Sequence, residues 1–255
     1  MDQLKKSVIL LLIVSLLVSC LYGCAETPAQ PTQAPQVAAT EAPAVEETVP
    51  METVDYAASV KLDMNSDTAK QTVSVKMFID GDTTHFYVPT SVSPNGVLKA
   101  RYIAINTPES TGKIEEYGKK ASSFTKEKLS SATSIIIESE SDIWDPDSTG
   151  DRYLVWVWYK PTGETAYRNL NLEILQNGLA IANSTANNRY GTICMNALNQ
   201  ARSAKLNVYS GQKDPDFYYG DAVELTLKEL RMNPETYNGV KVAFNGIITM
   251  NSNNS

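Results

Sequence analysis

The stretch Ile79-Asp80-Gly81-Asp82-Thr83 places two acids around a glycine, between two segments of alternating polar and apolar residues. One segment covers residues 73–79 and the other covers residues 83–88. Alternation of this kind is typical of strands that are buried on one face, and an Asp-Gly pair is typical of the tight turn between two such strands. The sequence therefore predicts a β-hairpin with Asp80 and Asp82 at its turn.

Outward from this hairpin, the chain contains further segments of strand and helix character. Strands are expected at residues 97–105, 134–138 and 152–159, and helices at residues 115–129, 169–182 and 192–206. Five strands with helices between them fit a small, closed, mostly antiparallel β-barrel with three flanking helices, an α+β fold of the OB type. A doubly wound parallel sheet fits poorly because strands and helices do not alternate regularly.

Polar side chains stand near the ends of these strands. Arg101 and Glu109 bound the stretch Arg101-Tyr102-Ile103-Ala104-Ile105-Asn106-Thr107-Pro108-Glu109, and Arg152 begins a later strand. Together with Asp80 and Asp82, they offer oxygen ligands for a cation, a carboxylate to activate water and two guanidinium groups for a phosphate. Hydrolysis of a phosphodiester with a metal ion requires this combination.

Each residue of this set also has an ordinary structural interpretation. In water an ion pair contributes only ~0–1 kcal/mol, so stability gives little reason to require arginine. The order and spacing of the residues, rather than any one of them, favour a site. The ordinary interpretations are a turn for Asp80 and Asp82, a strand end for Asn106 and Thr107, a loop acid for Glu109, a surface position for Arg101, and an ion pair with Asp147 or Asp151 for Arg152.

These segments resemble the staphylococcal nuclease-like (thermonuclease) family, and the resemblance covers residues 71–212. It implies an OB-fold barrel and Ca2+-dependent cleavage of DNA or RNA. The similar segments are the Asp80-Gly81-Asp82-Thr83 hairpin, the strand that ends in Asn106-Thr107-Pro108-Glu109, and helical stretches at residues 116–126, 171–180 and 201–209.

The resemblance also implies a set of metal ligands. Asp82 corresponds to a direct Ca2+ ligand, and Asp80 to a supporting acid near the metal. Asn106 occupies the position of the second direct carboxylate ligand, and the carbonyl group of Thr107 is a further ligand. By the same resemblance, the catalytic residues are Glu109 as the general base for the attacking water, with Arg101 and Arg152 binding the phosphate.

This chain departs from the family pattern at three places. One is Thr149-Gly150-Asp151 before Arg152, where the family's best-known member has Lys-Tyr. The family usually has aspartate where this chain has Asn106, and the loss of one formal charge is expected to weaken Ca2+ binding without abolishing it. Tyrosines that follow the second helix in the family's best-known member are replaced here by Asn183-Ser184-Thr185. Aromatic faces help to hold single strands, so we expect reduced stacking, with Tyr190 as the candidate replacement for substrate binding.

The first residues have the pattern of an export signal. In residues 1–23, two lysines precede an apolar run, and small residues precede Cys20 and Cys24. Both cysteines resemble the lipidated cysteine of bacterial lipoproteins, and the sequence does not choose between them. An ordinary secretory signal with incidental cysteines is the alternative. The lipoprotein interpretation predicts a lipid-anchored monomer on the extracellular side of a bacterial membrane.

Two further segments flank the predicted barrel. Residues 24–70 begin with a stretch rich in proline, alanine, threonine and glutamate, which predicts a disordered linker. Residues 221–255 contain a short helical pattern at 225–231 and a strand pattern at 240–248, like the opening of a second OB-like domain. That strand has no expected partner, so either it joins the first domain or the chain is a piece of a longer protein, which we favour.

Overall charge limits the classes of function. The formal net charge is -7, which argues against a protein that is held on nucleic acid by charge alone. The leading prediction is a membrane-anchored extracellular endonuclease that acts on DNA or RNA and needs no protein partner. One alternative is a weak or inactive module of the same fold that binds nucleic acid or protein, and another is a structural or adhesive surface lipoprotein.

Overall fold

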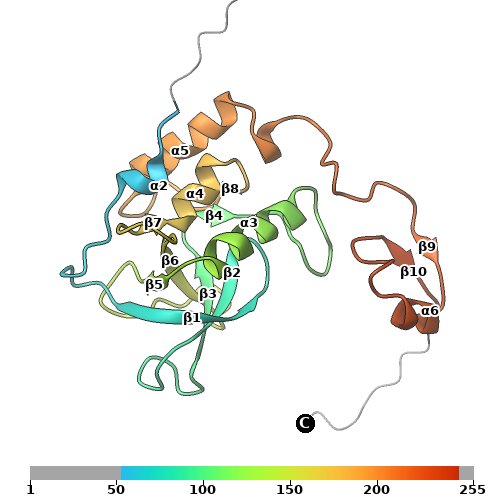
Figure 1. The fold of residues 1–255 in the computed structure, drawn as a ribbon, viewed down its shortest axis with the longest axis horizontal. Coiled ribbons are helices and arrows are strands. Elements are labelled where there is room, and N and C mark those ends of the chain that lie inside the picture. The colour runs from blue at the N-terminus through green and yellow to red at the C-terminus, as the bar shows by residue number, and fades with distance from the viewer. Residues whose placement is uncertain (1–52, 247–255) are drawn as a thin grey trace, which may run out of the picture. The chain divides into compact units, whose positions relative to one another are not determined.

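The computed structural model describes residues 53–246, and its centre is a β-barrel (Figure 1). The strands run in the order β3-β2-β1-β5-β6-β7. Their bounds are β1 (Lys70–Phe78), β2 (Thr83–Tyr87), β3 (Val97–Tyr102), β5 (Ser134–Glu138), β6 (Tyr153–Lys160) and β7 (Arg168–Asn169). The first two strands form the predicted hairpin, because β1 and β2 pair antiparallel on either side of the Asp80–Asp82 turn.

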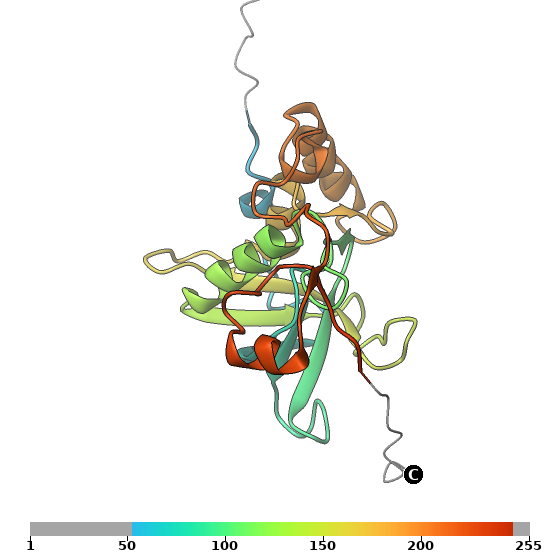
Figure 2. The same ribbon diagram turned by 90° about the vertical axis from the view of Figure 1, so that its right-hand side faces the viewer.

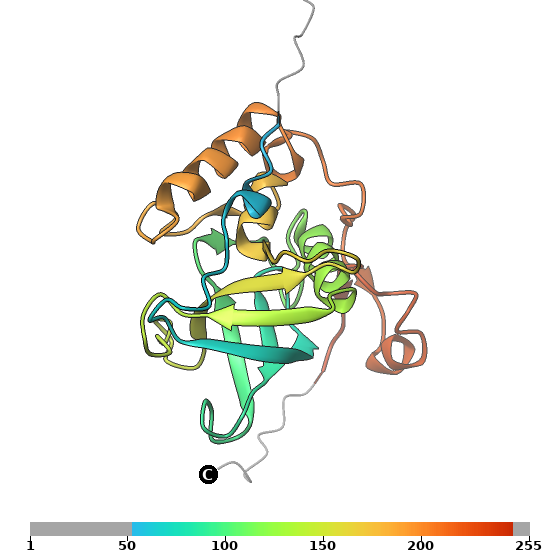
Figure 3. The same ribbon diagram turned by 60° about the vertical axis from the view of Figure 1, so that its left-hand side comes forward.

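A parallel pairing of β3 with β6 closes the barrel. Arg101 on β3 lies opposite Leu154 on β6, and the other neighbouring strands pair antiparallel. Figure 3 shows β1, β5 and β6 side by side. The prediction of a closed five-stranded barrel of the OB type is confirmed.

The strand β6 forms the middle of the hydrophobic core. Trp156 and Trp158 are fully buried in it together with Phe86 and Leu98. The indole nitrogen of Trp158 donates a hydrogen bond of 2.8 Å to a carboxylate oxygen of Glu138, which satisfies its only polar atom. Both tryptophans are therefore packing residues of the barrel.

Three helices flank the barrel, as predicted: α3 (Gly118–Ser130), α4 (Leu170–Gln176) and α5 (Gly191–Ser203). Figure 2 shows α3 against the strands. The prediction of one helix over residues 169–182 was wrong at its end. Gly178 adopts a φ of +64°, which stops the helix, and β8 (Ile181–Ala182) instead pairs with β4 (Ile105–Asn106).

The segment before the barrel is folded onto it (Figure 3). It contains the short helix α2 (Tyr56–Ser59), with Ala57 fully buried and Val60 nearly so. The backbone of Val54 exchanges two hydrogen bonds with the side chain of Gln200 on α5. The predicted boundary between linker and domain at residue 70 therefore needs correction, because apolar side chains near residue 57 are buried against α4 and α5.

After the 3-10 helix η1 (Asn207–Tyr209), the chain forms a small unit of its own. This unit consists of β9 (Val223–Glu224), α6 (Leu227–Met232) and β10 (Val242–Ala243). The helix begins with a capping box between Thr226 and Glu229. The prediction that the last strand lacks a partner was wrong, because β10 pairs in parallel with β9. Two residues are too few to give a strand signal in the sequence.

The predicted signal segment and both candidate cysteines, Cys20 and Cys24, lie outside the described residues, as does most of the predicted linker. Between residues 53 and 246, the structure contains no helix that could cross a membrane.

Candidate functional site

The turn between β1 and β2 holds both hairpin acids in a buried position. Asp82 is fully buried and Asp80 nearly so, and the backbone N–H of Asp82 donates to a carboxylate oxygen of Asp80 at 3.2 Å. A side chain on Gly81 would lie 2.8 Å from atoms of Thr107 and Ala121. The turn therefore needs glycine because it packs directly against the Thr107 segment and α3.

The carboxylate of Asp82 is the most connected group of the site. One oxygen accepts the backbone N–H of Thr107 at 2.8 Å, and the other accepts the hydroxyl of Thr83 at 3.0 Å and pairs with Arg101. Burial raises the pKa of Asp82 to about 7; the charge of Arg101 opposes that rise and the charge of Asp80 adds to it. An acid in this position needs a cation beside it to stay ionised.

The guanidinium group of Arg101 stands between two of the predicted metal ligands. One nitrogen donates to the carboxylate of Asp82, and the other donates to the side-chain oxygen of Asn106. The Arg101 side chain is only 12% exposed. The register of β2 and β3 brings these groups together, because Thr83 lies opposite Arg101.

The same oxygen atoms suit a hard cation. Those of Asp82 and Asn106 already converge on one positive group, and the hydroxyl oxygen of Thr107 is buried without a hydrogen-bond partner. Carboxylate oxygens and amide carbonyl oxygens are Ca2+ ligands. Among residues 53–246, no group of three or more histidine, cysteine, aspartate or glutamate side chains is close enough to hold a metal. The oxygen atoms of Asp82 and Asn106 are of the types that Ca2+ takes, and Arg101 is bonded to both.

Closure of the barrel brings the second arginine to the same place. Arg101 and Arg152 line one open cavity of about 500 Å³, whose wall also includes Asn183 and Ser184. The Arg152 side chain is 33% exposed, and its Nε donates to Asp147 at 2.7 Å. Burial would raise the pKa of Asp147, but hydrogen bonds from Thr149 and Arg152 outweigh it and lower that pKa. The two arginines thus face one space, each held by an acid.

Glu109 lies outside this cavity. Its side chain is exposed, on the loop between β4 and α3. Its backbone N–H donates to the Glu115 carboxylate at 3.1 Å, and its carbonyl accepts the Glu115 N–H at 2.9 Å. The structure therefore places Arg101 on both Asp82 and Asn106. It also places Arg101 with Arg152 on one cavity, whose lining includes neither the candidate ligands nor Glu109.

Tyr190 also lies apart from the cavity. Its ring packs edge-on against Trp156 and Trp158, with ring centres 5.0 and 6.1 Å away, and Arg189 lies over it. These contacts give Tyr190 a packing role. Its predicted part in substrate binding stays a prediction.

One buried polar residue near the site has a role that the sequence did not reveal. Asn171 on α4 is fully buried, and its side-chain oxygen accepts the backbone N–H of Val157 at 2.9 Å. Its amide nitrogen donates to the carbonyls of Ile103 and Val155 at 3.0 and 3.1 Å. Asn171 thereby ties α4 to the two segments that close the barrel. Its one signal in the sequence is an amide inside an apolar helix face.

Comparison with known protein families finds a match over part of the chain. Residues 99–211 match the family model described as "Staphylococcal nuclease homologue". This stretch is a domain of the staphylococcal nuclease homologue family. No curated protein matches the chain. Members of the family are typically nucleases and generally depend on Ca2+, so the domain has a nuclease-type fold and implies nucleic-acid binding.

The extent of the match matters for the site. The nuclease-homologue match includes Arg101, Asn106, Glu109 and Arg152, but it begins after the hairpin that carries the two buried acids. In the folded barrel, the hairpin still contacts the matched residues, because Asp82 is hydrogen-bonded to both Arg101 and Thr107.

Proposed function

We propose that this chain is a Ca2+-dependent endonuclease that hydrolyses phosphodiester bonds of DNA or RNA with water as the nucleophile. One observation carries the proposal. Arg101 and Arg152 line a single cavity, and Arg101 stands directly on the oxygen atoms of Asp82 and Asn106. A phosphate group in that cavity would meet two guanidinium groups, which bind its oxygens as paired, charge-assisted donors.

Each residue has a defined part in the proposed reaction. Asp82 and Asn106, with Thr107 and the nearby Asp80, would hold the cation. When bound, Ca2+ supplies positive charge beside the phosphate oxygens and lowers the cost of the charge that builds there. Glu109 would take a proton from the attacking water in the complex with substrate. Catalytic groups in unliganded structures often reach their productive distance only in the complex with substrate.

The ion pairs of the two arginines are expected to exchange partners when substrate binds. In the pair between Arg152 and Asp147, the arginine side chain is 33% exposed and the aspartate side chain 6%. Asp147 also accepts two hydrogen bonds from Thr149, which would remain if Arg152 turned to a phosphate. The pair between Arg101 and Asp82 is buried, and breaking it would leave an uncompensated charge unless another cation takes its place. A cation held by Asp82 would compensate this charge, and Arg101 could then pair with the phosphate, so we expect metal and phosphate to bind cooperatively.

A second function has specific support. The chain can be a module of the same fold that binds nucleic acid without cutting it. Asn106 replaces an acid at the expected ligand position, and the Glu109 carboxylate lies outside the cavity. Both features weaken catalysis more than they weaken phosphate binding by the arginines.

Cleavage of denatured DNA separates the two functions. The nuclease proposal expects cleavage with Ca2+, loss of cleavage with a chelator, and a large loss in Glu109→Gln. Glu127→Gln is the matched control, because Glu127 is an exposed acid on α3 and its replacement should leave the rate unchanged. Binding without cleavage supports the binding module. Neither binding nor cleavage at low salt supports a structural or adhesive role.

We also propose that the mature chain is lipid-anchored at Cys20 or Cys24 on the extracellular side of a bacterial membrane and acts as a monomer. The support is the sequence of residues 1–23. Mass spectrometry of the mature N-terminus of the wild type, Cys20→Ala and Cys24→Ala checks it. An unmodified N-terminus in the wild type would contradict the anchor.

A further inference from the structure

The helix α3 begins without a cap from its own sequence. Its N-cap residue Tyr117 has a φ of +64° and makes no side-chain cap hydrogen bond, and no acid lies in the first turn. A helix start normally needs an acceptor or a negative charge for its free N–H groups. This start directly follows the loop that carries Glu109.

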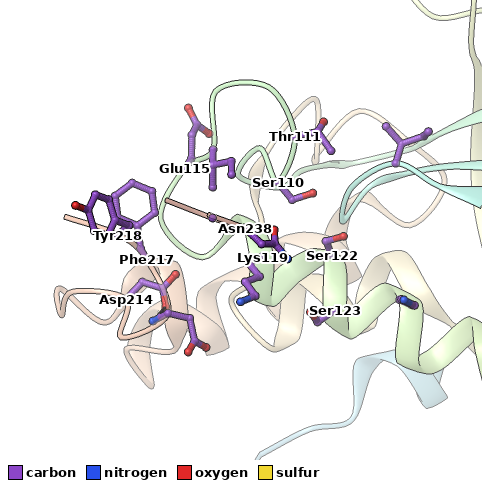
Figure 4. Close-up of a pocket in the computed structure, with 15 residues that line it drawn as sticks. Ser110, Thr111, Glu115, Lys119, Ser122, Ser123, Asp214, Phe217, Tyr218 and Asn238 are labelled. Atoms are coloured by element: carbon purple, nitrogen blue, oxygen red, sulfur yellow. Dashed lines mark hydrogen bonds between the residues drawn. The ribbon is translucent and has the colours of Figure 1, made fainter. Parts of the chain in front are cut away.

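A residue from far along the chain supplies the acceptor. Asp214 is only 1% exposed, and one of its carboxylate oxygens accepts the backbone N–H of Tyr117 at 2.7 Å. Its other oxygen accepts the N–H of Asp216 at 3.0 Å, and its own N–H donates to the hydroxyl of Tyr219 at 2.8 Å. Figure 4 shows Asp214 and Lys119, the latter in the first turn of α3, among the residues that line one pocket.

The side chain of Tyr117 is held by the same part of the chain. Its hydroxyl forms hydrogen bonds of 2.9 Å with the hydroxyl of Ser210 and with the carbonyl of Gln212. Both the backbone and the ring of Tyr117 are thus fixed by residues 210–214. The left-handed backbone of Tyr117 is strained for a residue other than glycine, so these contacts hold a conformation that the local sequence does not favour.

The position of Tyr117 fixes the position of Glu109. The next residue, Gly118, packs so closely on the loop that a side chain there would lie 2.1 Å from the carbonyl oxygen of Glu109. Glu115 closes the loop, since its N–H donates to that carbonyl and its carbonyl accepts the N–H of Gly118. The loop from Glu109 to Gly118 is therefore one unit, held at one end by Asp82 through Thr107 and at the other by Asp214.

We propose that Asp214 is a positioning residue for the reaction and acts by fixing the loop that presents Glu109 to the substrate. The inference rests on the proposed function. Asp214 follows the last residue of the family match, residue 211, so the family match does not cover it. The segment at residues 210–219 therefore helps to position the loop that carries Glu109.

The test compares Asp214→Ala and Asp214→Asn with Asp216→Asn in the full chain. Asp216 is the matched control, because it is an exposed acid two residues away. Hydrogen exchange of backbone amides and Ca2+-dependent cleavage of denatured DNA are measured on each variant. Asp214→Ala should raise exchange about tenfold at residues 109–118 and leave β2 and β5 unchanged.

In the same variant, kcat should fall by about 10–100-fold with KM nearly unchanged, because only the placement of the base is lost. Asp214→Asn keeps one acceptor and should lie between Asp214→Ala and the wild type, and Asp216→Asn should match the wild type. Unchanged exchange at residues 109–118, a uniform rise over the whole domain, or a normal kcat despite a mobile loop would each overturn the proposal. An inactive wild type would refute the nuclease function alone, and exchange would still decide whether Asp214 fixes the loop.

Discussion

The state of Asp82 determines the chemistry of the site at the scale of single residues. A buried carboxylate is costly unless a cation accompanies it, and the fold supplies Arg101 for this purpose. Asn106 shares the same guanidinium group without adding charge. Arg101 therefore compensates the charge of Asp82, and under the proposed function it would compete with Ca2+ for the oxygen atoms of Asp82 and Asn106.

Replacement of Arg101 should reveal this competition. Arg101→Gln removes the internal cation, so Ca2+ affinity measured by calorimetry should rise by about tenfold, corresponding to about 1.4 kcal/mol. Cleavage should fall in the same variant, because a phosphate contact is lost. Arg152→Gln is the control: it pairs with Asp147 and should leave Ca2+ affinity unchanged. Equal or weaker Ca2+ binding in Arg101→Gln would show that Arg101 does not occupy the cation position.

The residue types of this site were predictable from the sequence, but their contacts were not. Asp80 and Asp82 were recognisable as a pair because Asp-Gly marks a turn. The ion pair between Arg101 and Asp82 depends on the register of β2 and β3, which a single sequence does not specify. Asp214 was missed because its partner Tyr117 lies 97 residues away.

At the scale of elements, the closure of β3 against β6 places both arginines on one cavity. A parallel pair at a barrel seam has few backbone hydrogen bonds to hold it, and α4 reinforces it through the side chain of Asn171. The seam and α4 therefore form one structural unit behind the site.

A substitution of Asn171 tests the reinforcement. In Asn171→Leu, leucine has a size similar to that of asparagine but makes none of the three hydrogen bonds, so buried backbone groups are left unpaired. This change should lower the free energy of unfolding by about 3 kcal/mol. Urea unfolding measures the change. Asn183→Leu, at an exposed position, should change stability by less than about 0.5 kcal/mol. Similar unfolding midpoints for the two variants would mean that Asn171 does not hold the seam.

The segment before the barrel makes stability depend on pH through Asp55. Burial raises the pKa of Asp55, but hydrogen bonds from Arg168 and Gln176 lower it by a larger amount. The net pKa therefore lies below the ordinary value of 3.8. The ionised carboxylate thus favours the folded state above pH 3.8, and its contribution is lost as the pH falls through the lowered pKa.

Asp55→Asn should therefore destabilise the domain at neutral pH by no more than about 1 kcal/mol, since the Asp55 side chain is 48% exposed. The difference from the wild type in urea unfolding should shrink as the pH is lowered from 3.8. Asp63→Asn, an exposed acid of the same segment, serves as the control. A difference that is constant with pH would contradict the ion pair with Arg168.

Elements with strong local patterns were predicted well, and those set by tertiary partners were not. Alternation located β1 and β2 closely, and a short apolar run located β5, in which residues 135–138 are all buried. The end of α4 and the strand β8 escaped prediction, since Ile181 and Ala182 are exposed and form a strand only through their pairing with β4. Burial of Ala57 likewise depends on helices that follow it by more than a hundred residues.

For the whole molecule, the charge balance limits how nucleic acid can bind. Residues 71–213 contain 15 basic and 14 acidic residues, so long-range attraction of a polyanion is weak. Binding should depend on a few local contacts, chiefly the two arginines that line the cavity.

Salt dependence measures the number of these contacts. For single-stranded DNA, two phosphate contacts predict a slope of about -1.4 when the logarithm of the binding constant is plotted against that of the salt concentration. Fluorescence anisotropy of a labelled strand, with Ca2+ held constant, gives the slope, and Arg152→Ala should reduce it by about half. A slope steeper than about -4 would indicate a broad basic surface that this chain does not have.

The central claim is that Asp82 and Asn106 hold a cation beside two phosphate-binding arginines, and one measurement tests it most directly. The rate of single-strand cleavage is followed over a Ca2+ titration for the wild type and Asn106→Asp. Because Ca2+ affinity grows with ligand charge, both proteins should cut, and Asn106→Asp should reach half its maximal rate at a Ca2+ concentration about tenfold lower. No cleavage by either protein at any Ca2+ concentration would contradict the claim.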